Sequence, residues 1–309
     1  MSPIAAAPEI IEHAPISTWF RCGGSADRFA RPRGLDELRR CVDVDPDLRI
    51  VGDGANLLVS DEGVGELVVA LDAPELSQVD IDPATGRVEA GAGAPLPKVI
   101  SQSVKSGLGG LEKLAGIPAS VGGAIAMNAG GSFGAISDTL ESVRTVDRAG
   151  NVHERSAEDL GLGYRTAHLN NEIVVSAVFR LEPGDSQALH DRLVEVMGYK
   201  KRTQPLSDRS AGCAFRNPTL ELDLDGIGAA GERVSAGLLI DRAGCKGLRV
   251  GGAEVSSRHA NFVTTDDDAL AADVVGLMVE VAGRVHEHSG VRLRPEIVIW
   301  RREPNQRPA

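Results

Sequence analysis

The segment from 107 to 134 constrains the fold of this 309-residue chain more than any other part of its sequence. It holds nine glycines in 28 residues and few charged side chains, so its backbone is both flexible and apolar. Such a segment can follow the outline of a large ligand with buried backbone, or it can form a packing corner between a sheet and a helix. Composition alone leaves both alternatives open.

A second glycine turn, Val51-Gly-Asp-Gly-Ala-Asn56, follows a predicted strand. Two glycines around one residue let successive backbone N–H groups converge on an anion, although most such tripeptides are ordinary turns. The dinucleotide-binding pattern GxGxxG fails because Leu57 occupies the third glycine position, and the sequence has no GxxxxGK[ST] segment. A bound nucleotide would therefore need a different scaffold.

The composition excludes several classes of protein. The formal net charge of -11 opposes the phosphate attraction that drives non-specific nucleic-acid binding, and ten aromatic residues are too few for base-stacking platforms. No apolar run reaches the ~20 residues of a membrane helix, and the N-terminus has no basic region followed by an apolar core. The four cysteines lie far apart without a CxxC, which argues against disulfides or zinc. We expect a cytoplasmic protein that binds no nucleic acid, membrane or metal.

Apolar periodicity and turn signals predict the elements. The predicted strands cover 49–51, 57–60, 66–71, 87–90, 142–146, 173–181 and 291–300, and the predicted helices cover 95–106, 187–201, 234–243 and 268–288. The last helix carries one buried stripe, formed by Leu270, Val274, Leu277, Val281 and Val285. A Pro-Gly-Asp-Ser break at 183–186 marks a domain boundary, so we expect a tail at 1–16, domains at 17–184 and 185–301, and a tail at 302–309.

Many short motifs of this sequence, in both their residues and their order, resemble those of one enzyme family, the UDP-N-acetylenolpyruvoylglucosamine reductases. The glycine-rich core Gly116-Ile-Pro-Ala-Ser-Val-Gly-Gly-Ala, with Met127-Asn-Ala-Gly130 after it, resembles the family's flavin-binding core. The other blocks begin at Thr18, Gly52, Tyr164, Gln204, Ser210, Ala236, Lys246, Gly251, His259 and Leu293. The resemblance spans about residues 18 to 300.

The resemblance implies an α+β fold: a two-part FAD-binding domain of the vanillyl-alcohol-oxidase type, followed by a smaller α+β substrate-binding domain. It implies that NADPH reduces FAD and leaves, after which the enolpyruvyl sugar nucleotide takes a hydride from the flavin to give UDP-N-acetylmuramate for peptidoglycan synthesis. The sequence has no obvious room for the family's tyrosine-bearing loop after Phe179, so we expect the shorter type of the family. We also expect a monomer.

Three residues match the family's catalytic positions. Arg165 would hold the substrate carboxylate as negative charge builds on it. Glu296, on the polar face of the predicted strand, would hydrogen-bond the same carboxyl, in a protonated form if burial raises its pKa. Cys213 stands where the family usually has a proton-donating serine; an unperturbed thiol, with a pKa near ~8.5, stays mostly protonated at neutral pH. A thiol there is also open to oxidation.

The resemblance also implies two binding sets. The cofactor would be bound by Gly52, Asp53, Gly54, Ala55, Asn56, Leu57, Gly116, Ile117, Pro118, Ser120, Gly122, Gly123, Asn128 and Ile173. The substrate would be bound by Tyr164, Arg202, Arg216, Asn217, Lys246 and His259. Thr203 stands where the family commonly has a phosphate-binding lysine, so Lys200, Lys201 or Arg202 would take over that contact.

Two other functions fit parts of this pattern. A different FAD-linked oxidoreductase on the same scaffold would keep the Gly116–Gly123 block but has no use for Arg165, Cys213 and Glu296 together. A catalytically impaired sugar-nucleotide-binding protein would explain the cysteine at position 213.

Overall fold

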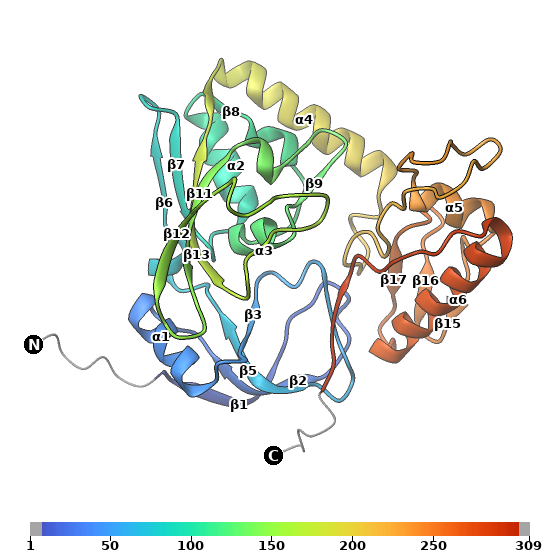
Figure 1. The fold of residues 1–309 in the computed structure, drawn as a ribbon, viewed down its shortest axis with the longest axis horizontal. Helices are drawn as coiled ribbons and strands as arrows, with labels where there is room; N and C mark the ends of the chain where they lie inside the picture. Colours follow the sequence, from blue (N-terminus) through green and yellow to red (C-terminus); the bar gives the residue numbers. More distant parts are fainter. Residues whose placement is uncertain (1–7, 303–309) are drawn as a thin grey trace, which may run out of the picture.

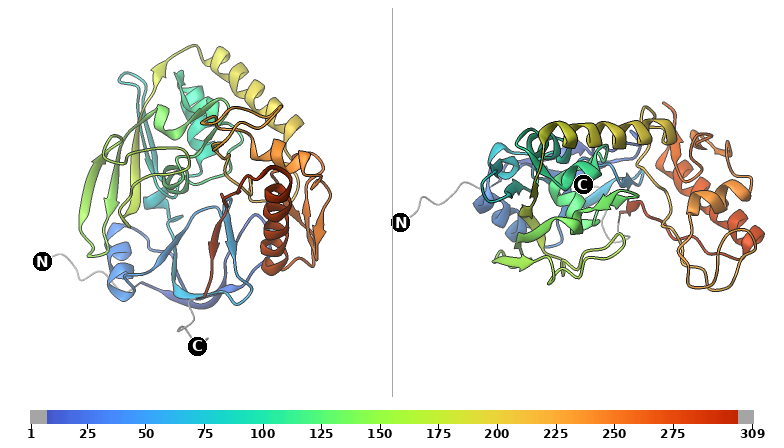
Figure 2. Two further views of the ribbon diagram at one scale, coloured as in Figure 1. Left: turned by 45° about the vertical axis from the view of Figure 1, so that its right-hand side comes forward. Right: turned by 90° about the horizontal axis from the view of Figure 1, so that it is seen from above.

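The computed structural model describes residues 8–302, which form two lobes joined by a long helix and a returning C-terminal segment (Figures 1 and 2). The first lobe begins with a four-stranded sheet in the order β1-β2-β5-β3. Its strands are β1 (Ile10–Pro15), β2 (Ser25–Ala30), β3 (Arg49–Val51) and β5 (Val64–Ala70), and helix α1 (Leu35–Val44) connects β2 to β3. Strands β2, β3 and β5 run parallel, and β1 is antiparallel to β2.

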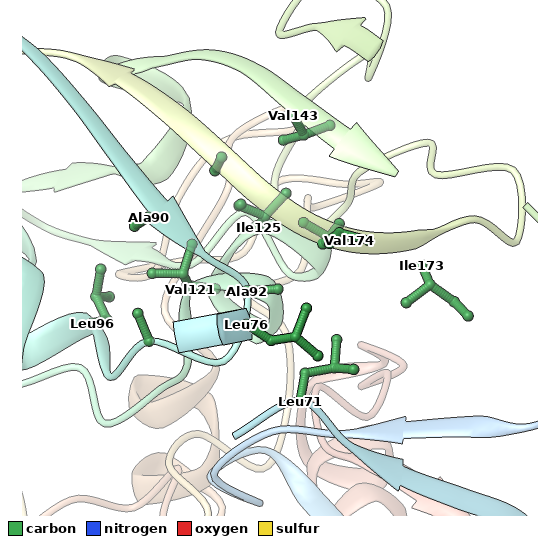
Figure 3. Packing of buried hydrophobic residues seen from close by; sticks show 14 of the residues in the cluster. Leu71, Leu76, Ala90, Ala92, Leu96, Val121, Ile125, Val143, Ile173 and Val174 are labelled. Atoms are coloured by element: carbon green, nitrogen blue, oxygen red, sulfur yellow. The ribbon is translucent and has the colours of Figure 1, made fainter. Parts of the chain in front are cut away.

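A second, antiparallel sheet in the order β12-β11-β13-β7-β6 completes this lobe. Its strands are β6 (Val79–Asp82), β7 (Arg87–Gly91), β11 (Leu140–Val146), β12 (Val152–Ser156) and β13 (Ile173–Arg180). The glycine-rich segment lies against this sheet and supplies the short helix α3 (Val121–Ala126). Figure 3 shows Val121 and Ile125 of α3 beside Ala90 and Val174 of the sheet. Because α3 packs on it, the central strand β13 is buried on both faces.

The second lobe is smaller. Helix α4 (Ser186–Thr203) runs along the first lobe and ends at the second one (Figure 1). Beyond it lie α5 (Ala236–Arg242), α6 (Ala271–Ser289) and the three-stranded sheet of β15 (Arg249–Val250), β16 (Ala253–Val255) and β17 (Val263–Thr265). The buried faces of α5, α6 and this sheet form one core, and Phe20 from the N-terminal segment inserts into it.

Short elements complete the fold. They are α2 (Leu96–Lys105), the 3₁₀ turns Pro74–Ser77, Leu111–Leu114 and Ile136–Asp138, and the short strands β4 (Leu57–Val59), β8 (Leu108–Gly109), β9 (Gly130–Gly131), β10 (Gly134–Ala135), β14 (Glu182–Pro183) and β18 (Val298–Trp300). Strand β18 pairs in parallel with β4, so the C-terminal segment returns from the second lobe to the first. This return matters because it carries the position predicted to be catalytic, Glu296.

Most predicted elements are confirmed, and three predictions need correction. The predicted tails are partly ordered: residues 10–15 form β1, and Arg302 pairs with Asp27 (2.7 Å). Residues 1–7 and 303–309 lie outside the described residues. The predicted strand 291–300 is regular only over β18, because Pro295 makes an isolated bridge with Phe215 instead. Helix α4, which follows the predicted boundary at 184/185, packs on α2 of the first lobe. The stripe of α6 excludes Leu270, which precedes the helix and is 55% exposed.

Within the described residues, no helix is long and apolar enough to cross a membrane.

Two leucines of the predicted stripe give a test of the second core. Leu277 is fully buried in α6, so Leu277→Ala should reduce the free energy of unfolding by about 2–5 kcal/mol through lost contacts and a cavity. The matched change Leu270→Ala should alter it by less than about 0.5 kcal/mol because Leu270 is exposed. Urea unfolding of both variants measures the difference; equal losses would contradict the packing described above.

Candidate active site

Arg165 lies in a tight turn whose backbone is held from the first lobe. Gly163 and Thr166 exchange two backbone hydrogen bonds (3.1 and 3.3 Å), which leaves Arg165 in the left-handed region at φ 55°. The buried Asn128 fixes this turn: its amide nitrogen donates to the Gly163 carbonyl (2.9 Å), and its oxygen accepts from Ser137 N (3.0 Å). The structure therefore uses Asn128, predicted to bind cofactor, to position the turn that carries Arg165.

Glu296 meets Arg165 where the returning segment passes between the lobes. Arg165 Nε donates to Glu296 Oε1 (2.6 Å), and the carboxyl is largely buried. The backbone of Glu296 is held from both lobes, since its N–H donates to Ala214 O (2.8 Å) and its carbonyl accepts from Asn56 Nδ2 (3.1 Å). Burial raises the pKa of Glu296, and Arg165 opposes that rise. The result is a carboxyl group that takes up a proton more readily than an exposed glutamate.

Cys213, in the second lobe, lies close enough to this pair for both of its charges to act on the thiol. Its segment bridges Phe262, and the buried Asn261 holds Phe215, two residues after Cys213: Phe215 N donates to Asn261 Oδ1 (2.9 Å) while Asn261 Nδ2 donates to Phe215 O (2.8 Å). Burial raises the pKa of the Cys213 thiol to about 12; the negative charge of Glu296 adds to this rise, whereas Arg165 opposes it. The thiol therefore stays protonated at neutral pH.

A fourth ionisable side chain, Lys200, lies near this group. It is buried at the C-terminal end of α4, where a Cβ added to Gly116 would lie 3.1 Å from its Cδ. Burial lowers the pKa of Lys200 to about 8, and the charge of Arg165 contributes to the shift. Arg202, by contrast, is exposed on the same helix and lies over Gly198. Of the basic residues around 200–202, the structure thus brings Lys200, and not Arg202, toward Arg165.

A cavity of about 490 Å³ lies in the first lobe between the two glycine turns. Six of the predicted cofactor residues line it: Gly52, Asp53, Ser120, Gly122, Gly123 and Ile173. The turns approach so closely that a Cβ on Gly52 would lie 2.4 Å from Ser120 Oγ. Glycine backbone beside apolar walls suits a diphosphate joined to flat rings, so the residues present fit FAD.

The other predicted cofactor residues lie outside that lining. Ala55 is half-buried in the Val51–Asn56 turn. Gly54, at φ +66°, lies so close to the N-terminal segment that a Cβ on it would be 2.2 Å from Ser17 O. Leu57 is a core residue of β4, and Asn56 joins Glu296 and Val298 through its side chain and backbone. Gly116 packs against Met197 and Lys200, and Ile117 and Pro118 are half-buried in the loop that follows.

The predicted substrate residues divide into two groups. Near Arg165, the Tyr164 hydroxyl accepts a hydrogen bond from Asn217 N (3.1 Å). The positive charge of Arg216 opposes the rise in the pKa of Glu296. His259 lies deeper in the second lobe against Phe262, with ring centroids 4.7 Å apart, and burial lowers its pKa, so it is neutral. Lys246 is exposed and pairs with Asp241 (2.8 Å).

Sequence reasoning missed two residues of this site. Asn261 belongs to a block, His259-Ala-Asn-Phe262, that was singled out for its histidine, yet the asparagine makes the structural contacts. Arg233 lies in a stretch without any motif, and its guanidinium carbon is 4.3 Å from the centroid of the Tyr164 ring. No pattern in the chain indicates that contact. Within residues 8–302, no group of three His, Cys, Asp or Glu side chains is arranged to bind a metal.

Comparison with known proteins agrees with this geometry. The C-terminal domain of UDP-N-acetylenolpyruvoylglucosamine reductase matches residues 204–300, and an FAD-binding domain family matches 26–156. The reductase of that name from Paramagnetospirillum magneticum is 40% identical over 92% of this chain and 89% of its own length. This chain belongs to the UDP-N-acetylenolpyruvoylglucosamine reductase family.

Further relatives extend the agreement to the whole fold. A reductase of the family from Synechococcus is 39% identical over 92% of this chain and 90% of its own length. The crystal structure of the Thermus caldophilus reductase superposes with a TM-score of 0.79 at 37% identity, covering 95% of this chain and 98% of that one. The predicted fold class, an FAD-binding domain followed by a family-specific C-terminal domain, is confirmed.

The lowered pKa of Lys200 is directly measurable. In a protein whose lysines carry ¹³C-methyl groups, one NMR resonance should titrate near pH 8 and be absent from Lys200→Met. Because burial penalises the charged form, Lys200→Met should raise the free energy of unfolding below pH 8, by about 3 kcal/mol at most, and this gain should vanish toward pH 10.5. If every lysine resonance titrates above pH 9.5, Lys200 is not buried as described.

Proposed function

We propose that this chain reduces UDP-N-acetylenolpyruvoylglucosamine to UDP-N-acetylmuramate for peptidoglycan synthesis, with FAD as cofactor and NADPH as reductant, through Arg165, Glu296 and Cys213. One observation carries the residue assignment. The three side chains come from segments far apart in the sequence, yet Arg165 Nε donates to Glu296 Oε1 (2.6 Å), and the charges of both groups act on the pKa of the Cys213 thiol. That grouping matches the chemistry which this family's substrate requires.

The substrate is an enol ether that carries a carboxylate. Its reduction adds a hydride to the terminal carbon, moves the electron pair of the double bond toward the carboxylate, and ends when a proton adds to the carbon that bears it. FAD, when bound, supplies the hydride that it has received from NADPH. The residues of the chain must therefore bind the carboxylate, stabilise its growing charge and deliver one proton.

Arg165 and Glu296 act on the carboxylate. Only the Nε of Arg165 donates to Glu296, and no hydrogen bond to another described residue occupies its terminal nitrogens. Those two nitrogens can hold a carboxylate bidentately, and their positive charge favours the form in which both oxygens are negative. The raised pKa of Glu296 lets its protonated carboxyl donate a hydrogen bond to the same group, because the anionic substrate adds to the burial that already favours the proton.

Cys213 delivers the proton. Its thiol is protonated at neutral pH, as a proton donor must be before the reaction. When negative charge develops on the neighbouring carbon, a thiol is still a sufficient acid, and Arg165 stabilises the thiolate that forms, which is the direction in which Arg165 already shifts its pKa. The resulting thiolate must recover its proton before the next turnover.

We extend the proposal to the organisation of the protein. The FAD-binding part comprises the first lobe with α4 and β18, and the substrate-binding part comprises about 204–297. Strand β13 leads into α4 through residues 181–185, which supports the shorter type of the family. All four cysteines are free, as in a cytoplasmic protein, and the chain acts as a monomer on a sugar nucleotide.

A visible spectrum of the purified protein tests the function. We expect flavin absorbance that NADPH bleaches and that returns under anaerobic conditions only when the enolpyruvyl sugar nucleotide is added. A protein that stays colourless after addition of FAD would instead support a sugar-nucleotide-binding role. Flavin reoxidised by simple alcohols or by oxygen alone would support another oxidoreductase on this scaffold.

Substitutions at Cys213 test the proton donor separately. Cys213→Ala should leave the reduction of flavin by NADPH unchanged and slow its reoxidation by the sugar nucleotide by about 10²–10⁴-fold, the range for loss of a positioned acid. Cys213→Ser should keep substantial activity because a hydroxyl can donate the same proton. Stopped-flow absorbance separates the two half-reactions, and a Cys213→Ala enzyme that reoxidises at the normal rate would contradict this role.

A further inference from the structure

The hairpin from 218 to 234 brings a second arginine to the ring of Tyr164. Its stem is closed by backbone hydrogen bonds from Leu220 N to Glu232 O (2.9 Å) and from Val234 N to Pro218 O (2.9 Å). Arg233 lies in this stem, and its guanidinium carbon is 4.3 Å from the Tyr164 centroid, whereas that of Arg165 is 5.4 Å away. Two guanidinium groups, one from each lobe, therefore lie against one ring.

The charge of Arg233 is uncompensated. Arg165 pairs with Glu296, but among residues 8–302 no carboxylate lies within ion-pair distance of Arg233 or Arg216. The neighbouring acids of the hairpin are used elsewhere, since Asp223 accepts from Ala230 N (2.8 Å) and Glu232 accepts from Ala229 N (3.1 Å). A positive charge without a carboxylate partner favours the binding of an anion beside it.

The position of Arg233 is also fixed in advance. The Tyr164 ring is anchored through its hydroxyl to Asn217 N, and the side chain of Asn217 accepts from Ala236 N (2.9 Å), just beyond the hairpin stem. A guanidinium that rests on a held aromatic ring loses less freedom when it binds a ligand than one on a free side chain. Arg233 is itself exposed, so a ligand can reach it.

We propose that Arg233 is a further substrate-positioning residue, which binds the diphosphate of the sugar nucleotide while Tyr164 orients it. This inference rests on the proposed function. The substrate carries a carboxylate at one end of the reacting unit and two phosphoryl charges beyond the sugar. Arg165 is committed to the carboxylate, so the unpaired Arg233 and Arg216, near the same tyrosine and Glu296, suit the diphosphate, which a planar guanidinium can bind through two nitrogens.

Arg233→Met tests this role because methionine keeps an apolar contact with Tyr164 but removes the charge. We expect the KM for the sugar nucleotide to rise about 10- to 100-fold, as loss of one charge-assisted contact predicts, with kcat changed less than about threefold. UDP binding, measured by calorimetry, should weaken by a similar factor, whereas uridine binding and the reduction of flavin by NADPH should not change. Arg233→Lys should recover part of the lost affinity.

The control is Arg249→Met, which removes an exposed arginine of the same lobe that pairs with Glu254 and Asp266. It should leave KM, UDP binding and uridine binding unchanged. If Arg233→Met weakens uridine and UDP equally, or lowers thermal stability without changing KM, the contact with Tyr164 is structural and the proposal is wrong. Failure of the proposed function would look different, because the wild-type protein itself would then show no flavin reoxidation by the sugar nucleotide.

Discussion

The ion pair between Arg165 and Glu296 is the contact on which the site depends. Its partners are 131 residues apart and come from a strained turn of the first lobe and from the segment that returns from the second. A buried ion pair of this kind contributes little to stability, since the loss of hydration offsets the attraction. Its value here is positional, because it fixes the direction of a guanidinium whose terminal nitrogens remain available.

The surroundings of this pair favour the protonated forms of the nearby carboxyl and thiol groups. Burial raises the pKa of both Glu296 and Cys213, and the positive charge of Arg165 only partly opposes it. Burial lowers the pKa of Lys200 for the same reason, because a charged ammonium is penalised where a neutral carboxyl or thiol is favoured. The site thus holds a protonated thiol, and a carboxyl group that takes up a proton more readily than an exposed one, beside an arginine, which suits a reaction that ends in protonation of a carbon next to a carboxylate.

The sequence indicated the residues proposed for catalysis better than it indicated the residues that hold them in place. Arg165, Glu296 and Cys213 were found because their blocks resemble a family, and without that resemblance each would be one residue among many of its type. Asn56 and Asn128 were assigned to the cofactor because they lie in its motifs, yet their side chains hold Glu296 and the Arg165 turn. Such roles depend on contacts over 35 to 240 residues, which neither periodicity nor spacing records.

The same limit explains the misplaced C-terminal strand. Alternating residues at 291–300 satisfy the strand pattern, but only residues 298–300 find a partner in β4, while Glu296 N donates to Ala214 in the other lobe. The irregular residues before 298 allow the backbone of Glu296 to bond to both lobes. A strand that continued along β4 would keep Glu296 in the first lobe, whereas a segment bonded to both lobes places its carboxyl against Arg165. The loops proposed to bind cofactor and the residues proposed to bind substrate are joined at this point, because the Asn56 side chain links the Val51–Asn56 turn to the backbone of Glu296 through a single amide.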